Sequence, residues 1–477
     1  MRVGIWTMVC VAWAASLNVQ AQQAGKKYTL RECIDIAISN NTRVKRSLYN
    51  VRSFEIAQSQ ALFNMAPTLS LNAGGGLNLG RALNPVTNQF EANSSIRSLN
   101  PNLSSSWTLF NGLRLQYALR QSMKDKEASE EDLLKTRNDV TLSVVNAFLS
   151  LVLNKELFEN ATYQLNSSQQ QLERIQKQVA AGSLPMSNQL TQEAQVATNE
   201  VNRITQENAV NLAYLQLKQA MQVPATEVVE VEIPQVALED IVLQQNAQDI
   251  YQLALQAMPE IRSAALKVES AELQLKSARG ALYPRLFLSA AAASNYSSVN
   301  STGFLRLSSK SYQPVGIVQS SGDVVVSLQN DYMIYNNDEA RQLKDNFYKT
   351  FNLTLAIPIL QGLSARTNVQ RAAVSKEIAH IAVTEAENTL RQSIETAYND
   401  ALAASKTYAA SEKQVRAQEE AYRMNKQRFE IGALSFVEYH VSENDMFRAK
   451  SDLLRAKYTF IFRKKLLDFY AGKQVIE

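Results

Sequence analysis

Two long intervals without glycine or proline constrain the fold of this 477-residue chain more than any other feature. Neither residue occurs at positions 113–181 or 363–431, and the two intervals are equal in length. Both residues interrupt helices, and a continuous helix of this length would extend for about 100 Å. A single compact domain of this chain length has a radius of gyration of only about 22 Å. The sequence therefore predicts very long helices and an elongated molecule.

The positions of glycine and proline also indicate an internal duplication. Gly112 and Gly182 recur at one common separation, as Gly362 and Gly432, whereas Pro67 recurs at a shorter separation, as Pro284. The difference between the two separations predicts an insertion in the second half, as a polar exposed loop at 297–346. The predicted organisation is a signal peptide (1–21), a first repeat (22–222, with a strand pair at 67–113), a linker (223–246) and a second repeat (247–477, with a strand pair at 283–362); in each repeat a helix precedes the strand pair and a long helix hairpin follows it.

The N-terminal segment has the pattern of a secretory signal. Arg2 precedes an apolar run at 5–17, and Val19-Gln20-Ala21 fits a cleavage site. A membrane anchor is the alternative, but the run is shorter than the roughly 20 residues that a spanning helix needs. Cleavage leaves Cys33 as the only cysteine, which is expected to pack as a small apolar residue.

Composition excludes several classes of protein. Hydrophobic residues make up 45% and charged residues 20% of the chain, and no apolar run of about 18 residues follows the signal. No membrane-spanning helix is therefore expected. The net charge is only +4, and basic and acidic residues alternate along the helical segments, so nucleic acid is not an expected partner.

The helices that follow Gly182 and Gly432 carry apolar residues at coiled-coil spacing. A second apolar line on the later helix suggests two helical neighbours, as in a cylinder wall, although an ordinary antiparallel bundle fits the same pattern. The first stripe is Leu190, Ala194, Ala197, Val201, Ile204, Asn208, Asn211 and Leu215; the second is Met446, Ala449, Leu453, Ala456 and Phe460.

Four segments alternate between apolar and polar residues with the period of a β-strand. The connection at 80–101 is expected to be a loop. One apolar and one Ser/Asn/Thr face suit either a transmembrane β-barrel or a soluble sheet, and four strands are too few to close a barrel without two, three or four identical chains. The residues expected to face lipid are Leu103, Trp107, Leu109, Leu353, Leu355 and Ile357.

Six short motifs are spread over both repeats. They are Tyr28-Thr29-Leu30-Arg31-Glu32, Trp107-Thr108-Leu109-Phe110-Asn111-Gly112, Met258-Pro259-Glu260-Ile261-Arg262, Ala281-Leu282-Tyr283-Pro284-Arg285-Leu286, Leu355-Ala356-Ile357-Pro358-Ile359-Leu360-Gln361-Gly362 and Arg428-Phe429-Glu430-Ile431-Gly432-Ala433-Leu434-Ser435. These motifs resemble those of the TolC-like family of outer-membrane efflux proteins. Their order and spacing, more than any single motif, make the resemblance specific.

The resemblance implies a homotrimer of mixed α and β structure in the outer membrane. Each chain would give four strands to a 12-stranded transmembrane β-barrel, continued by a long periplasmic α-helical barrel. The function implied is the exit duct of a tripartite export system, which receives drugs or toxic compounds from an inner-membrane RND or ABC-type transporter. A periplasmic adaptor would dock at the helix tips, with Gly182, Leu184, Gly432, Leu434 and Ser435 as the contact candidates.

In that family, acidic residues just past the second tip surround the entrance of the channel, and Glu438 occupies the place here. The second acidic position is Val441, and the first-repeat equivalents Asn188 and Thr191 are uncharged. Three copies of Glu438 would repel one another, raising at least one apparent pKa and favouring a bound cation. An ordinary solvated glutamate is the alternative.

Enzymatic function has little support in the sequence. His380 and His440 are the only histidines, and no nucleophile elbow, phosphate-binding loop or metal-ligand spacing is present, so neither catalysis, metal nor cofactor is expected. Two alternatives remain open: a type I protein-secretion duct, and a soluble periplasmic coiled-coil adaptor.

Overall fold

The computed structural model describes residues 27–84, 89–232, 246–298, 304–335 and 338–473, which fall into two compact units. The predicted signal peptide and much of the predicted linker lie outside these ranges. The first unit comprises Met1–Glu55, Lys124–Glu269 and Glu377–Glu477, and the second comprises Ile56–Met123 and Ser270–Lys376.

The helices repeat with the two separations seen in the sequence. Helices α3 (Arg114–Ala180) and α8 (Ser364–Glu430) have 67 residues each, as the intervals without glycine or proline predict. Each is followed by a second long helix, α4 (Met186–Met221) or α9 (Phe436–Tyr470). The shorter helices α1 (Leu30–Asn40) and α2 (Thr42–Phe63) recur as α5 (Ala247–Ala257) and α6 (Pro259–Gly280). The predicted duplication is confirmed.

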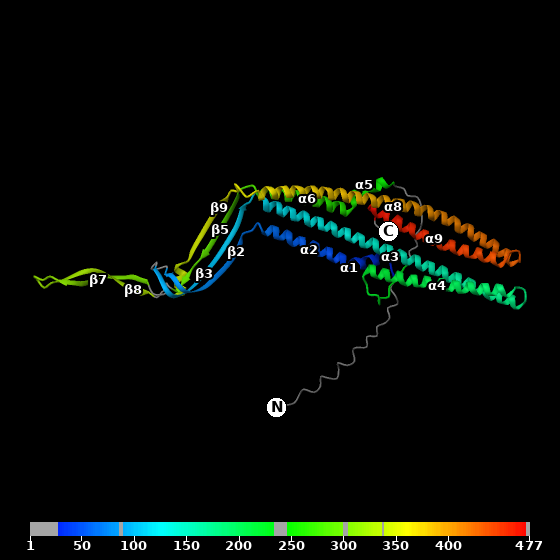
Figure 1. The fold of residues 1–477 in the computed structure, drawn as a ribbon, viewed down its shortest axis with the longest axis horizontal. Coiled ribbons are helices and arrows are strands. Elements are labelled where there is room, and N and C mark those ends of the chain that lie inside the picture. Colours follow the sequence, from blue (N-terminus) through cyan, green and yellow to red (C-terminus); the bar gives the residue numbers. More distant parts are fainter. Residues whose placement is uncertain (1–26, 85–88, 233–245, 299–303, 336–337, 474–477) are drawn as a thin grey trace, which may run out of the picture. The chain divides into compact units, whose positions relative to one another are not determined.

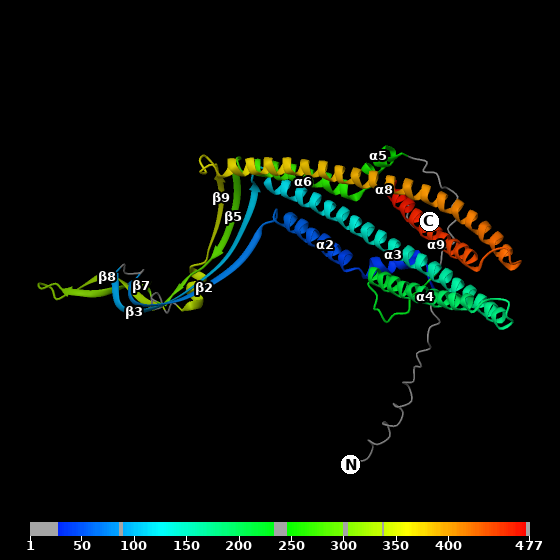
Figure 2. The same cartoon turned by 45° about the vertical axis from the view of Figure 1, so that its right-hand side comes forward.

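In the first unit, the hairpin α3–α4 and the hairpin α8–α9 lie side by side (Figures 1 and 2). Their core contains the fully buried Phe148 and Leu151 of α3, together with Tyr458 and Ile461 of α9. Cys33 is also fully buried there, and burial raises the pKa of its thiol to about 11. A small parallel pairing of β1 (Lys27–Tyr28) with β4 (Glu230–Val231) covers one edge of this core.

Helix α3 corrects the expectation that no helix is apolar enough to cross a membrane. It contains an 18-residue window with a mean hydropathy of 1.3, of which 44% is buried. Val144, Val145 and Val152 of α3 are at most 1% exposed within the helical core. Burial in a helix bundle selects apolar residues as a lipid environment does, so this helix is explained by its packing.

The second unit contains an antiparallel sheet whose four long strands have the order β2-β3-β5-β9. The strands are β2 (Thr68–Asn84), β3 (Gln89–Phe110), β5 (Arg285–Ala293) and β9 (Tyr348–Ala356), and the short β6 (Tyr296–Ser297) pairs with β3. The loop predicted at 80–101 is wrong, because β2 and β3 remain paired out to Asn84 and Gln89. A register shift between Gly80 and Ala82 interrupts the alternation that the prediction relied on.

The segment 297–346, expected to be a loop, contains regular structure. Strand β7 (Phe304–Ile317) pairs with β8 (Val324–Tyr335), and the short helix α7 (Glu339–Asp345) follows. Two register shifts within the β7–β8 pair, around 308 and 315, break the period of two along β7. The polar composition of the segment therefore concealed a long hairpin.

Candidate functional site

The turns between the long helices have the same backbone conformation in both repeats. Gly182 and Gly432 each have a φ of 74°, a left-handed value that glycine adopts without steric cost. The N–H of Ser183 donates to the carbonyl of Gln178 at 2.9 Å, and that of Ala433 donates to Arg428 at 2.8 Å. Each turn is thus a Schellman motif that ends one helix and reverses the chain.

The second turn has a capping box that the first turn lacks. Ser435 Oγ accepts from the N–H of Glu438 at 3.3 Å and donates to Glu438 Oε2 at 2.7 Å, while the N–H of Ser435 donates to the same carboxylate at 3.2 Å. These bonds lower the pKa of the exposed Glu438 carboxyl below its ordinary value of 4.5. At the first turn, Pro185 occupies the N-cap position without a side-chain hydrogen bond.

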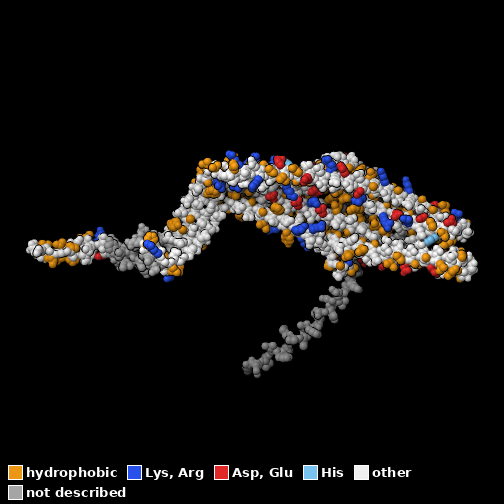
Figure 3. Space-filling model, in the orientation of Figure 1, with side chains coloured by type: hydrophobic (Ala, Val, Ile, Leu, Met, Phe, Trp, Pro, Cys, Tyr) orange, Lys and Arg blue, Asp and Glu red, His pale blue; other side chains and the backbone are white. Residues whose placement is uncertain are grey.

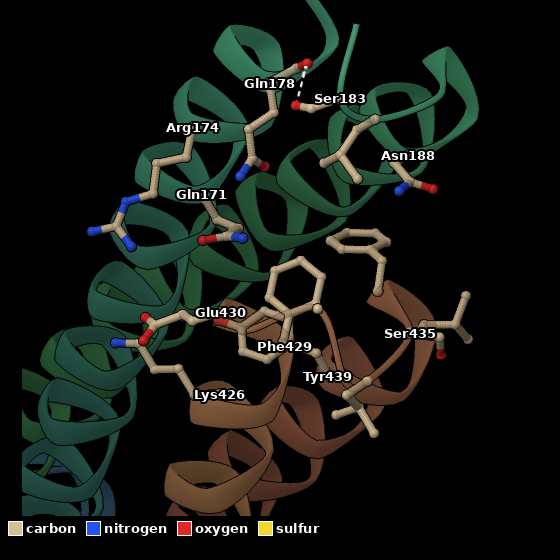
Figure 4. A pocket seen from close by; sticks show the side chains of 15 residues that line it. Gln171, Arg174, Gln178, Ser183, Asn188, Lys426, Phe429, Glu430, Ser435 and Tyr439 are labelled. Atoms are coloured by element: carbon tan, nitrogen blue, oxygen red, sulfur yellow. Dashed lines mark hydrogen bonds between the residues drawn. The ribbon is translucent and has the colours of Figure 1, made fainter. Parts of the chain in front are cut away.

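A cleft of about 610 Å³ lies between the two turns (Figure 4). It brings together four of the predicted contact candidates, Leu184, Gly432, Leu434 and Ser435, which come from opposite halves of the sequence. Gly182 lies in the first turn but does not line the cleft. Charged side chains reach the cleft from facing helices: Arg174 from α3, and Lys426 and Glu430 from α8.

A cluster of aromatic side chains packs beneath the two turns, and this cluster was not predicted from the sequence. The rings of Phe429 and Tyr439 stack with centroids 4.9 Å apart, and Phe429 also contacts Phe436. Leu184 and Leu434 pack, half-buried, against this cluster, which also contains the fully buried Ile175. Burial, with a smaller contribution from Glu443, raises the pKa of the Tyr439 hydroxyl. The signal in the sequence was four aromatic residues within ten positions of Gly432: Tyr422, Phe429, Phe436 and Tyr439.

Behind the tip, polar side chains join the two hairpins. Ser167 of α3 donates to Glu443 of α9 at 3.0 Å, and Glu443 is only 3% exposed. Asn160 of α3 donates to Ser451 of α9 at 2.9 Å. A buried carboxylate needs such donors, so these bonds fix the lateral position of one hairpin against the other. Glu193 is the equivalent of Glu443 in the first repeat, but it is not buried, and the sequence did not indicate this difference.

The sheet separates apolar from polar side chains as predicted. Leu103 pairs with Leu71, and Trp107 pairs with Leu288, which in turn pairs with Leu353. Neighbouring positions place Ser70, Ser104 and other small polar residues on the opposite face, where a shallow hollow of about 200 Å³ is lined by Thr68, Ser70, Ser104, Ser106, Ser289, Thr350 and Asn352, among others.

Two residues of the predicted apolar face occupy other places. The register shifts between Thr108 and Phe110, so Phe110 takes the position opposite Leu286 and Leu109 lies at the irregularity. Strand β9 ends at Ala356, which leaves Ile357 beyond the ladder, next to a proline that lacks an N–H donor. Leu355 pairs with Leu286 and keeps its predicted place.

Within the described ranges, no group of three or more His, Cys, Asp or Glu side chains is arranged to hold a metal ion. His380 lies on the surface of α8, and His440 stacks on Phe436 with ring centroids 5.8 Å apart. The features that distinguish the tip are thus its turns, its cleft and the exposed carboxylates of Glu430 and Glu438.

Comparisons with known proteins agree with this architecture. Residues 33–222 and 250–472 match the family model described as outer membrane efflux protein. Over 264 residues the chain is 25% identical to the pyoverdine export outer membrane protein OpmQ of Pseudomonas aeruginosa, and the match spans 54%, about half, of each chain.

Solved structures share the fold over nearly the whole chain. The outer membrane protein VceC of Vibrio cholerae superposes with a TM-score of 0.72 at 14% identity, covering 94% of this chain and 96% of VceC. The open state of the MtrE outer membrane channel of Neisseria gonorrhoeae gives a TM-score of 0.69 at 19% identity, covering 93% and 88%.

Proposed function

Because the chain belongs to the outer membrane efflux protein family, we propose that it is the exit duct of a tripartite export system for small molecules. The family consists of channels, and transport without chemistry of its own is the proposed mode of action of this chain. It lies in the outer membrane and extends into the periplasm. The predicted mixed α and β fold of this family is confirmed, and its assembly into a trimeric 12-stranded β-barrel, continued by a helical barrel, is part of the proposal.

The observation that carries this function is an amphipathic sheet with two open edges. Among the described strands, β2 pairs only with β3, and β9 pairs only with β5. In lipid, each unpaired N–H or C=O costs several kcal/mol, so the sheet needs partners along both edges. Copies of the same chain supply them in a closed barrel, with the leucines of the apolar face toward lipid and the serines toward the lumen.

The two turns at the helix tips support an adaptor site. Gly182 and Gly432 have open space around the position of a Cβ atom, and Ser435 is exposed beside them. The cleft between the turns offers apolar Leu184 and Leu434 at its border. A partner with a helical hairpin would place its tip into such a cleft, so a periplasmic adaptor is the proposed occupant.

Glu438 is the proposed gate residue, with a double role. Its carboxylate starts helix α9 through the capping box, and its exposure leaves the charge available to ions. Val441, one turn later, is 53% exposed and apolar, and Glu443 is buried, so Glu438 is the exposed carboxylate of the first two turns of α9. Threefold repetition would give one acidic ring at the entrance.

For the cargo and the inner-membrane pump, we propose only their chemical and protein classes. OpmQ is named for pyoverdine export, and this likeness supports export of a small molecule. An RND or ABC-type transporter is the proposed pump. Type I protein secretion is the second candidate within transport, but no described feature favours it. The soluble adaptor is set aside, because the family match spans both repeats.

The first experiment is detergent extraction of the mature protein from outer membranes, followed by native mass spectrometry and imaging. A particle of three chains with a detergent belt is expected. A monomer recovered without detergent would overturn the proposal, because one chain cannot close a barrel with four strands.

A further inference from the structure

The β7–β8 hairpin occurs only in the second repeat, and its two faces differ in chemistry. The register places Ile317 opposite Val324, Pro314 opposite Val326, and Tyr312 opposite Leu328. These six residues share one side, because directly paired residues in an antiparallel ladder point to the same face. The other side carries three polar pairs, Gln313 with Ser327, Ser311 with Gln329, and Ser309 with Asp331, and one further pair, Gly316 with Val325. We call the first side the apolar face.

The apolar face is uncovered in the single chain. Tyr312 is 71%, Ile317 is 69% and Val324 is 59% exposed, and Val326 and Leu328 are about half exposed. Figure 3 shows hydrophobic side chains gathered over this hairpin. An isolated two-stranded hairpin is at best marginally stable in water, and a contiguous apolar patch of this kind marks an interaction surface.

Lipid does not suit this surface. The described part of the hairpin forms a two-stranded sheet, so the outer edge of each strand presents N–H and C=O groups that lack a ladder partner. In hydrocarbon such groups cost several kcal/mol each, and only closed barrels avoid the cost. Lys310 and Asn330, which pair with each other in register beside Tyr312 and Leu328, also place polar groups on the same side of the hairpin.

The root of the insertion is fixed to the end of the main sheet. Gln342 of α7 is only 1% exposed and accepts from the N–H of Ser297 at 3.1 Å. Ser294 donates to the carbonyl of Leu343 at 2.6 Å, and Asn346 donates to the carbonyl of Asn295 at 2.8 Å. Both ends of the insertion are therefore joined directly after β5 and directly before β9.

Three such roots lie around the rim of one trimer. Twelve strands spaced about 4.8 Å apart, and tilted, close into a barrel about 24 Å across. A strand of the length of β8, which has 12 residues, extends for about 40 Å at 3.4 Å per residue. Each hairpin is thus longer than the mouth is wide, so hairpins of neighbouring chains that project along the barrel axis or across the mouth lie within reach of one another.

We propose that the three β7–β8 hairpins of a trimer pack on one another through the apolar face and form a collar beyond the outer mouth of the barrel. The occupant of each face is a second copy of the same hairpin, which matches it in length and in apolar character. This inference rests on the trimeric channel proposed above. The collar would extend the exit beyond the membrane surface and narrow it.

Cysteine cross-linking in intact outer membranes tests the collar. Val326→Cys places a thiol on the apolar face. Ser327→Cys is the matched control, because the adjacent residue places its thiol on the opposite, polar side of the hairpin. The native Cys33 is buried with a raised pKa, so it does not compete for the reagent. With a short bis-maleimide, we expect chain-to-chain cross-links from Val326→Cys at a yield at least about five times that of Ser327→Cys, since only one face lies in the contact.

Each other result has a defined meaning. Equal yields, or no cross-link from Val326→Cys in a particle that native mass spectrometry shows to be trimeric, would overturn the collar and leave the channel intact. Cross-links to a different protein, or labelling of Val326→Cys by a lipid-phase probe, would also overturn it. A particle that is not trimeric would instead refute the proposed function.

A second variant protects the test against misfolding. Val324→Asp adds a charge to the apolar face, and we expect it to abolish cross-linking through Leu328→Cys while the particle stays trimeric in the outer membrane. Persistent cross-linking in this double variant would contradict packing through the apolar face.

Discussion

At the residue scale, the sequence predicted the local backbone well at the helix ends, where the conformation favours glycine. Glycine spacing located the ends of the long helices at 182 and 432, where the structure has a φ of 74° that glycine adopts without steric cost. It did not reveal that Glu438 starts a helix, although Ser435 followed three residues later by glutamate is a capping-box pattern. Alternation also did not reveal the register shift at Leu109, because a bulge leaves no mark on the local pattern.

The charge and the capping role of Glu438 can be separated by substitution. In Glu438→Gln, the side-chain oxygen still accepts from the N–H of Ser435, so the helix start is retained. We expect the preference of single channels for K⁺ over Cl⁻ to fall at least about twofold, because a ring of one sign concentrates counter-ions. Ser435→Ala is the control: it costs about 1 kcal/mol of capping but keeps the charge. An unchanged reversal potential in Glu438→Gln would remove the gate proposal.

The pH dependence of selectivity tests the same carboxylate. Its pKa in the folded chain lies below 4.5, so the charge persists as pH falls from 7 to 5, and both charge and capping are lost only when pH falls through the lowered pKa. We expect the reversal potential of the native channel to be constant over pH 5–7. Loss of selectivity near pH 6 would mean that repulsion among the three copies outweighs the bonds from Ser435.

At the element scale, the two coiled-coil stripes differ in burial although the spacing of their apolar residues is alike. In α9, Met446, Ala449 and Phe460 are buried within the chain, whereas in α4 Val201 is 64% and Ile204 is 44% exposed. Periodicity predicts an apolar face but not what covers it. We propose that a neighbouring chain covers the exposed stripe of α4.

Charge placed on that stripe is expected to separate the chains. Val201→Glu would leave three carboxylates in an apolar contact, and burying each without a partner costs several kcal/mol. Native mass spectrometry is expected to show monomers. Asn202→Glu is the matched control, because Asn202 points about 100° away around the helix and is also exposed. Equal trimer fractions in the two variants would show that α4 does not form the contact.

The strands offer a comparable pair of neighbours on opposite faces. Leu353 of β9 pairs with Leu288 on the apolar face, while Asn352 pairs with Ser289 on the polar face. Arginine on the lipid face of a barrel costs about 2–4 kcal/mol near the midplane, but a lumen position tolerates it. We expect Leu353→Arg to reduce the amount of folded protein in the outer membrane strongly and Asn352→Arg to leave it nearly unchanged. Equal amounts would contradict the assignment of the faces.

At the scale of the whole molecule, duplication and family could be inferred from the sequence, but the β7–β8 hairpin could not. The two separations between the repeats appear in the structure, where α3 begins at Arg114 and α8 at Ser364, whereas α1 begins at Leu30 and α5 at Ala247. The insertion has no counterpart in the first repeat, so no internal comparison could correct its assignment as a loop. The two register shifts in β7 also interrupt the alternation of apolar and polar residues, which was the remaining sequence pattern that could have indicated a strand.

Cargo also belongs to this scale, because no single residue of a wide duct selects it. A 12-stranded barrel, about 24 Å across between backbones, admits small molecules and an unfolded polypeptide alike. The described polar face of the sheet is lined by hydroxyl and amide groups such as Ser70, Ser104 and Asn352, which leaves selection to the pump.

We expect deletion of the gene to raise the sensitivity of cells to toxic small molecules, measured as inhibitory concentrations, and to leave the set of secreted proteins unchanged. Complementation with the native chain should restore resistance, whereas Leu353→Arg, which fails to insert, should not. Loss of one secreted protein with unchanged resistance would favour the type I secretion duct instead.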